Sequence, residues 1–435
     1  MVELTTDYPK FQFSDERLKN GLRLIMSESH LVPVAAVNLW YDVGSKNDAP
    51  GKTGIAHLFE HMMFEGSANV TKGQHFKLIN SVGGTNNAST STFRTNYFEW
   101  APSHNLEMLM WLEADRMGGL LQGLNQKTLD NQRDVVKNER RQVVEDVPYA
   151  VWQEKAFELL FPEGHPYRYP IIGSMDDLSA VSLKDVKDFF SAHYAPNNAV
   201  LSIVGDIDPA QVRKWAEKYF GKIPANPKIP ALRELELPFT LGGEVRETIR
   251  DRVPYAGVFM AHRSPGIETR EDDVLSMAGA VLAAGNGSRM HQRLVRERIT
   301  LAASFQTFSQ PGVSMSYAVG IANPSIFEDR VEQGLLELID SLKTEPISGD
   351  ELARARALVE RSLIDGLTTV AARADWLSRH ATIFDDPGKA NEKLDDLMSV
   401  TADEIRDVAN EILVKENRAV ITVLPKPPKP KARNK

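Results

Sequence analysis

Hydrophobic and polar positions alternate along the first part of the chain and predict a sheet with helices packed on it. Residues 34–43 form a strand pattern whose apolar side carries Ala35, Val37, Leu39, Tyr41 and Val43. Before it, Asn20-Gly21 is a hairpin turn flanked by apolar residues. After it, the pattern predicts helices over about residues 54–66, 73–81, 104–118 and 126–146, with β-rich residues 85–100 in the middle. The N-terminal half is therefore predicted to be α+β, with helices on one side of a sheet.

The same order of elements returns in the second half. A proline-rich stretch, residues 223–240, predicts a linker. Beyond it we expect strands over 244–249 and 255–261, then a helix over 272–284 that ends in a Gly-Ser turn. The predicted fold class is thus α+β, with two structurally similar α/β sandwich domains made by internal duplication. The predicted boundaries are residues 1–222, linker 223–240, residues 241–424 and a basic, proline-rich tail at 425–435.

Composition narrows the function classes. A chain of 435 residues suits two domains of about 200 residues each. The net charge of −8 argues against a general nucleic-acid binder, and no apolar run approaches the ~20 residues of a membrane span. The sequence contains no cysteine, which excludes disulfides, thiol nucleophiles and zinc sites built on cysteine.

The helix predicted over residues 54–66 carries the candidate chemistry. At about 100° per residue, His57, Glu60 and His61 share one face of this helix, and apolar residues cover the other. Two histidines one turn apart can bind one zinc ion, and a glutamate beside them can act as general base. The order H-x-x-E-H is the reverse of the H-E-x-x-H zinc motif. The alternative is an amphipathic helix that binds no metal.

A zinc site with one open position needs a third protein ligand. Glu139, in the helix predicted over 126–146, is the best candidate, but on spacing alone Glu145 and Glu154 compete with it. The alternative for each is a solvated helix carboxylate. Among the other histidines, His75 has no metal partner at useful spacing, and we assign it no chemistry.

Five segments, taken in order, resemble the pitrilysin or insulinase family of zinc peptidases. They are His57-x-x-Glu60-His61, Gly83-Gly84-x-x-Asn87-Ala88, Val136-x-Asn138-Glu139, His165-Pro166-Tyr167, and Tyr194 to Ala199 before Val204-Gly205-Asp206. The chain looks most like the bacterial two-domain branch related to mitochondrial processing peptidase. The resemblance implies two similar domains that face each other as half of a clamshell, with one Zn²⁺ per chain in the first.

The resemblance also singles out Glu139 as the third zinc ligand. Two helical turns before Glu139, the family often has a glutamate, and this chain has Gln132 there. A glutamine can hydrogen-bond a neighbour but brings no charge. The effect of the groups around the ligands on the zinc is therefore expected to differ. The strand after Gly83-Gly84 is expected to offer its edge to an extended peptide, with Asn87 and Ala88 meeting the peptide backbone.

The second half is expected to keep the fold without the metal. Aligning its Gly-Ser turn with the first places Ser276, Gly279 and Ala280 where the first half has its two histidines and Glu60. In the family this half supplies an arginine and, seven residues later, a tyrosine that reach the substrate carbonyl. Here Arg296 matches the arginine, but Ala303 replaces the tyrosine. Our hypothesis is a heterodimer with a zinc-less paralogue that supplies an Arg/Tyr pair; a homodimer is the alternative.

The sequence thus predicts a zinc metalloendopeptidase that hydrolyses short or unfolded peptides. His57, His61 and Glu139 would hold the metal, Glu60 would be the general base and Arg296 would contact the substrate. The alternative is a non-catalytic peptide-binding or structural subunit of the same fold. Because bacterial relatives are often exported, we expect the periplasm, with a signal peptide removed before this numbering, and keep the cytoplasm as the alternative.

Overall fold

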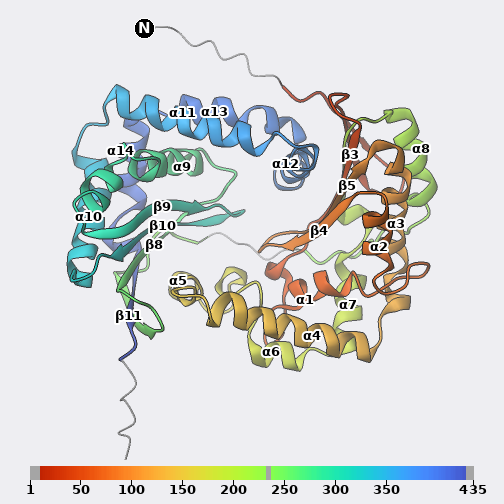
Figure 1. The fold of residues 1–435 in the computed structure, drawn as a ribbon, viewed down its shortest axis with the longest axis horizontal. Coiled ribbons are helices and arrows are strands. Elements are labelled where there is room, and N and C mark those ends of the chain that lie inside the picture. The colour runs from red at the N-terminus through yellow and green to blue at the C-terminus, as the bar shows by residue number, and fades with distance from the viewer. Residues whose placement is uncertain (1–9, 232–236, 428–435) are drawn as a thin grey trace, which may run out of the picture. The chain divides into compact units, whose positions relative to one another are not determined.

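The computed structural model describes residues 10–231 and 237–427, and these residues form two compact units (Figure 1). The first unit comprises the described parts of residues 1–136, 171–233 and 364–394, and the second comprises the rest. The division at residue 136 falls inside one continuous helix, α4. Within the predicted linker, residues 232–236 lie outside the described residues, as do residues 428–435 of the predicted tail.

The first unit is built on a six-stranded sheet with the order β1-β2-β6-β3-β5-β4. Its strands are β1 (Ser14–Arg17), β2 (Arg23–Glu28), β3 (Val34–Tyr41), β4 (Thr85–Thr90), β5 (Thr95–Pro102) and β6 (Ala199–Gly205). β1 and β2 pair antiparallel around the predicted Asn20-Gly21 turn, where Gly21 has φ 88°. β4 is an edge strand, and among the described residues its strand partner is β5 alone.

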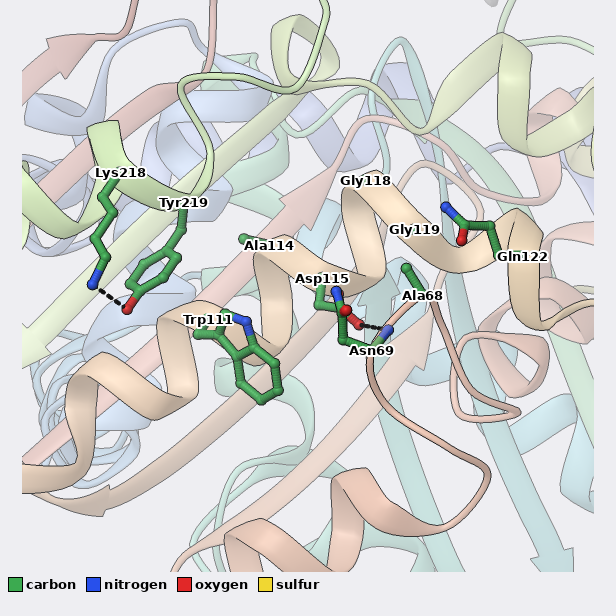
Figure 2. Close-up of a pocket in the computed structure, with 10 residues that line it drawn as sticks. All are labelled: Ala68, Asn69, Trp111, Ala114, Asp115, Gly118, Gly119, Gln122, Lys218 and Tyr219. Atoms are coloured by element: carbon green, nitrogen blue, oxygen red, sulfur yellow. Dashed lines mark hydrogen bonds between the residues drawn. The ribbon is translucent and has the colours of Figure 1, made fainter.

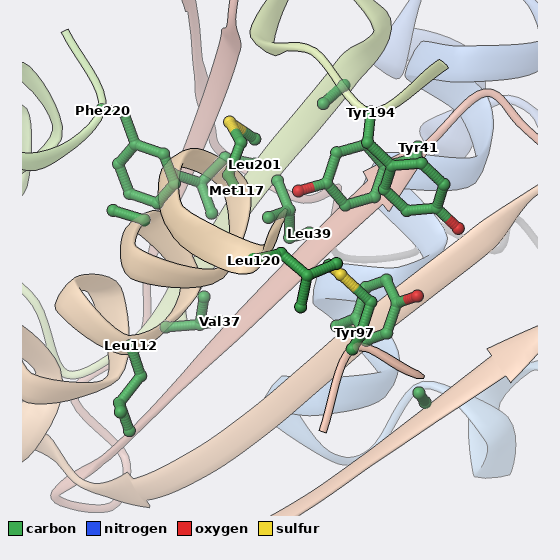
Figure 3. Close-up of a cluster of buried hydrophobic side chains, with 14 of the residues drawn as sticks. Val37, Leu39, Tyr41, Tyr97, Leu112, Met117, Leu120, Tyr194, Leu201 and Phe220 are labelled. Carbon is green, nitrogen blue, oxygen red and sulfur yellow. The ribbon is translucent and has the colours of Figure 1, made fainter. Parts of the chain in front are cut away.

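Helices on one face of this sheet enclose the main hydrophobic core. The helices of the unit are α1 (Ile55–Met62), α2 (Gln74–Ser81), α3 (Leu106–Gly123), α4 (Gln126–Arg140), α6 (Met175–Ala180), α7 (Leu183–His193), α8 (Pro209–Tyr219) and α12 (Val370–Ile383). The predicted apolar side of β3 lies in this core, so the alternation along residues 34–43 is confirmed. Figure 3 shows part of it, with Met117 and Leu120 of α3 near Leu39 of β3.

The prediction of helices on one side of the sheet was wrong, because α12 covers the opposite face. Its Ala374 and Leu377 pack in a second buried cluster with Ala36 and Trp40 of β3 and Val204 of β6. Polar bonds add to this packing: Trp40 Nε1 donates to the Asp375 carboxylate at 2.8 Å. The apolar residues on the second face of the sheet therefore need a helix that lies far downstream in the sequence.

The second unit repeats the strand order of the first. Its strands are β7 (Val245–Asp251), β8 (Gly257–Pro265), β9 (Thr300–Phe308), β10 (Val313–Ala322) and β11 (Arg418–Pro425), in the order β7-β11-β8-β10-β9. The outer pair β7-β11 is parallel and the other pairs are antiparallel. The strands β2-β6-β3-β5-β4 of the first unit pair in the same way, with β2-β6 as the parallel pair. Two similar sheets in one mixed chain confirm the predicted fold class.

Helices of the second unit also cover both faces of its sheet. They are α5 (Val151–Leu160), α9 (Arg270–Ala283), α10 (Glu328–Thr344), α14 (Ala402–Ile412) and most of α11 (Gly349–Gly366) and α13 (Lys393–Ser399). α9 and α10 pack on one face, while α5, from the N-terminal half of the sequence, packs through Phe157 and Leu160 on the other. None of the helices within residues 10–231 and 237–427 is long and apolar enough to cross a membrane.

Candidate metal centre

The helix that carries the motif, α1, is fixed at its first turn. Gly54 has φ 86°, and a Cβ built on it would lie 2.6 Å from the Ile172 carbonyl oxygen, so only glycine fits. The Asp48 carboxylate accepts the backbone N–H groups of Gly54 at 2.6 Å and Ala56 at 3.1 Å. Burial raises the pKa of Asp48 to about 8, although these backbone bonds oppose the rise. The start of α1 is thus held by a half-buried acid that the sequence analysis did not identify.

The predicted two faces of α1 are present. Its apolar side lies in the main core, with Leu58, Phe59 and Met62 fully buried. His57 and His61 are half-buried on the other side, and their ring centroids are 4.9 Å apart. α1 ends at Met62, earlier than the predicted Gly66, and this shorter helix still contains the whole motif.

Glu139, in the last turn of α4, lies next to the two histidines. One ligand atom each of His57, His61 and Glu139 lies within 4.8 Å of the others. The two competing carboxylates differ in their surroundings: Glu145 is exposed in the π-helical turn after α4, and Glu154 of α5 forms a bidentate pair with Arg140 at 2.6 and 2.9 Å. Two imidazole nitrogens and one carboxylate oxygen are a ligand set that zinc accepts, and three protein ligands leave a fourth position for water. The donor set therefore fits zinc.

Glu60 projects from α1 between the two histidines in sequence and is 9% exposed. Its Oε2 accepts a hydrogen bond from the Thr90 hydroxyl, at the end of β4, at 2.6 Å. The candidate base is thus tied to the edge strand. Sequence reasoning missed Thr90, although it lies three residues beyond the quoted Asn87.

Asn87 and Ala88 lie in the middle of β4. Asn87 is exposed, and its Oδ1 accepts the N–H of Ala88 at 2.9 Å. This N–H therefore points away from β5 and toward the open edge of the sheet. Since ladder groups alternate along a strand, the outward groups recur at every second residue.

Gln132 binds a neighbour, as expected for an uncharged residue at this position. Its amide donates to Glu65 Oε1 at 2.6 Å, while Lys72 Nζ lies 2.6 Å from Glu65 Oε2. Glu65 follows the motif by four residues and is 6% exposed. The contact ties α4, which carries Glu139, to the segment after α1; an effect of Gln132 on a metal remains a prediction.

The loop after α1 is also held by α3 (Figure 2). Asp115 accepts hydrogen bonds from the Ser67 hydroxyl and from Asn69 Nδ2, the latter at 2.6 Å. A Cβ on Gly119 would lie 2.7 Å from the Ala68 Cβ, so α3 approaches this loop closely. Except for Ser67, these residues line a cavity of about 280 Å³ that also reaches Lys218 and Tyr219 of α8.

A second group of candidate ligands lies inside the first unit, where none was expected. His75, Glu99 and Glu113 are each at most 3% exposed, and their ligand atoms lie within 4.8 Å of one another. Arg116 forms an ion pair with Glu113 and lies 3.8 Å from Glu99. Sequence spacing could not reveal this cluster because its residues come from α2, β5 and α3.

The electrostatics of this buried cluster favour a proton over a metal ion. Burial lowers the pKa of His75 to about 3 and raises the pKa of Glu113 to about 8. Burial raises the pKa of Glu99 as well, so the two carboxyl groups retain one proton between them beside the Arg116 guanidinium, and the cluster is neutral. A divalent cation would leave excess positive charge in the core, so we describe the cluster as an ion pair with a retained proton.

Arg296 and Ala303 lie in the second unit. Arg296 is exposed after the π-helical turn His291–Val295, and its guanidinium donates to Gln292 Oε1 at 2.9 Å. Ala303 lies on β9, the edge strand at the end of the sheet. The role of Arg296 in catalysis remains a prediction.

The motif helix has a metal-free counterpart in the second unit. α9 follows β8 as α1 follows β3, and it carries Ser276, Gly279 and Ala280. A Cβ on Gly279 would lie 3.1 Å from the Phe305 ring of β9, so the helix packs closely on the edge strand at this point. None of these three residues is a metal ligand.

Comparison with known proteins gives two family matches in this chain. Residues 23–161 match the model "Insulinase (Peptidase family M16)", and residues 180–359 match "Peptidase M16 inactive domain". The chain is 28% identical to zinc protease PqqE of Helicobacter pylori, over 91% of this chain and 88% of the relative. It is 27% identical to the mitochondrial-processing peptidase subunit beta of Blastocladiella emersonii, over 96% and 89% of the two chains.

A solved structure has the same fold. The crystal structure of a protease from Helicobacter pylori aligns with a TM-score of 0.89 at 26% identity, over 96% of this chain and all of the other. The similarity therefore extends through both units and is not confined to the motif.

Proposed function

Because the chain belongs to the M16, or insulinase, family of peptidases, we propose that it is a zinc-dependent endopeptidase for short or unfolded peptides. The observation that supports this most is the meeting of His57, His61 and Glu139 beside Glu60. Sequence relatives named zinc proteases support the metal and the reaction class.

In this proposal His57, His61 and Glu139 hold the metal and Glu60 moves the proton. A zinc ion bound there would supply Lewis-acid activation of water and of the scissile carbonyl near neutral pH. Glu60 takes a proton from the attacking water and passes it to the amine nitrogen of the leaving peptide. Glu60 therefore gains a proton when the water oxygen bonds to the scissile carbonyl carbon, and it gives up that same proton when the C–N bond breaks.

The open edge of β4 supports an extended peptide as substrate. The outward N–H of Ala88 can donate to a peptide carbonyl once the Asn87 side chain moves aside. Backbone pairing tolerates many side chains, and it requires a segment whose own backbone is unpaired. We therefore propose unfolded or short peptides, and not folded proteins.

We also propose a heterodimer with a zinc-less paralogue. Ala303 lacks a hydroxyl donor for the oxyanion, and loss of one such donor costs about 10²- to 10³-fold in rate. A partner chain with an Arg/Tyr pair would restore it, and Arg296 is the residue of this chain that would take part. Full activity of the purified chain, unchanged by the paralogue, would contradict the heterodimer and leave the peptidase intact.

The alternative function is a non-catalytic peptide-binding or structural subunit. The match of the second half to the "inactive domain" model favours this alternative, because α9, the counterpart of the motif helix, carries no metal ligand at the equivalent positions. A turnover assay separates the two functions, since both use the same strand edge. We place the protein in the periplasm, with the cytoplasm as the alternative; fractionation of the native cells would decide.

The experiment for the base compares the wild type with Glu60→Gln in zinc content and in hydrolysis of internally quenched peptides, with and without the paralogue. We expect equal zinc in both proteins and loss of hydrolysis in the variant. Substantial hydrolysis by Glu60→Gln would remove Glu60 from the proposed role.

A further inference from the structure

The side chain of Thr90, at the end of β4, is joined directly to the candidate base. Its hydroxyl lies 2.6 Å from Glu60 Oε2, within the range of strong hydrogen bonds from a hydroxyl to a carboxylate. An ionised carboxylate can only accept, so the Thr90 hydroxyl is the donor. The bond fixes the direction of a side chain that otherwise rotates about three single bonds.

The position of Thr90 is itself firmly held. It ends β4 just before a tight turn, in which Ser91 N–H donates to the Arg94 carbonyl at 2.8 Å. The loop before α1 braces this turn, because Lys46 N–H donates to the Thr92 carbonyl at 2.8 Å. A Cβ on Gly44 would meet the carbonyl oxygens of the turn, so the loop and the turn are in close backbone contact.

The residue opposite Thr90 also limits its movement. Thr95 of β5 is its register partner and is fully buried. The Thr95 hydroxyl donates to the Val43 carbonyl at 2.9 Å. The backbone that carries the Thr90 hydroxyl therefore has little freedom to move away from Glu60.

We propose that Thr90 is a positioning residue for peptide hydrolysis: it orients Glu60 for proton transfer and links the base to the strand that receives the substrate. The proposal rests on the proposed function, in which Glu60 is the general base. Thr90 acts through Glu60 and donates no proton to the reaction. Its contribution is therefore expected in kcat and not in KM, since the peptide pairs with the backbone of β4.

The test uses three variants of the full chain, assayed with internally quenched peptides and, where activity requires it, the paralogue. Thr90→Val and Thr90→Ala remove the hydroxyl, and Thr90→Ser retains it. We expect the first two to lower kcat by about 10- to 100-fold, the effect of one hydrogen bond to a charged group, with KM nearly unchanged. Thr90→Ser is expected to stay close to the wild type, and zinc content is expected to be equal in all three.

A matched control is Ser103→Ala. Ser103 also donates a hydroxyl to a carboxylate in the first unit, at 2.9 Å to Asp206, but lies past the other end of β5. We expect this variant to keep the wild-type kcat. A thermal melt of each variant separates misfolding from a catalytic effect.

Several results would overturn the proposal. They are a wild-type kcat in folded Thr90→Val, an equal loss in Thr90→Val and Thr90→Ser, a change in KM alone, or loss of zinc with the hydroxyl. Failure of the proposed function gives a different result: either the wild type would show no peptide hydrolysis, or Glu60→Gln would hydrolyse peptides as the wild type does. An inactive Glu60→Gln with an unaffected Thr90→Val would refute the role of Thr90 alone.

Discussion

Asp375 of α12 is predicted to be essential to the stability of the first unit. One oxygen of its carboxylate accepts three hydrogen bonds from the sheet: Asn38 Nδ2 at 3.1 Å, Trp40 Nε1 at 2.8 Å and Asn96 Nδ2 at 3.0 Å. The three donor residues are each at most 2% exposed. Replacing Asp375 by alanine leaves these donors without their shared acceptor in a region that water reaches poorly.

The expected loss in the free energy of unfolding follows from these three hydrogen bonds. A hydrogen bond to a charged group contributes about 1.5–3 kcal/mol, and the three share one oxygen, so we expect less than their sum. A buried donor left without an acceptor costs about 1–3 kcal/mol, and because the costs of the three neighbouring donors do not add fully, we expect about 3–5 kcal/mol for Asp375→Ala. Asp375→Asn keeps an acceptor oxygen and is expected to lose about half as much.

Denaturation in guanidinium chloride, followed by tryptophan fluorescence, measures this cost. Of the six tryptophans, one, Trp152, lies in the second unit, so the signal reports mainly the first. As a control, Asp188→Ala removes an exposed partner of Lys184 and is expected to leave the midpoint unchanged. If Asp375→Ala lowers the free energy of unfolding by less than about 1 kcal/mol, the claim that these hydrogen bonds hold α12 on the sheet is refuted.

Three further predictions concern pH and metal. Burial lowers the pKa of His75 and His262 to about 3 and of His193 and His380 to about 4, so the unfolded chain binds more protons below pH 6.5. Stability is therefore expected to fall as pH decreases from about 6.5 toward 4; a flat denaturation midpoint over this range would contradict these shifts. Because the pKa of Glu113 is about 8 in the folded chain and about 4.5 in the unfolded chain, its contribution to stability decreases as pH rises from about 4.5 to 8. It partly offsets the histidines below pH 6.5 and is not opposed by them above it, so stability should fall from about pH 6.5 to 8, and Glu113→Gln should reduce this fall in the same assay. Removal of zinc with a chelator should abolish peptide hydrolysis and lower the melting temperature, and added zinc should restore both; hydrolysis that survives complete zinc removal would exclude a metal mechanism.

Features set by local sequence were largely predictable. The alternation along residues 34–43 identified the buried side of β3, and the spacing of His57, Glu60 and His61 placed them on one face of α1. The repeated order of elements predicted the duplication that the two equivalent sheets display. For β3 and α1 the periodicity of a single element carries the information, and for the duplication the order of consecutive elements carries it.

Features that depend on distant partners were not predictable in the same way. Periodicity shows that a face is apolar, but not which helix covers it, so the packing of α12 and α5 on the second faces of the sheets was missed. The cluster around His75 joins three separate elements, and the bond from Thr90 to Glu60 joins a strand to a helix. The nearest sequence signal for that bond is the polar, threonine-rich segment after Gly84.

The central claim is that His57, His61 and Glu139 form a zinc site. The most direct measurement is the zinc content per chain of the purified wild type, His61→Ala and Glu139→Ala, each shown to be folded. One zinc per chain in the wild type, with loss in both variants, is the predicted result. Zinc that remains fully bound in the variants, or a wild type that binds none, would contradict the account.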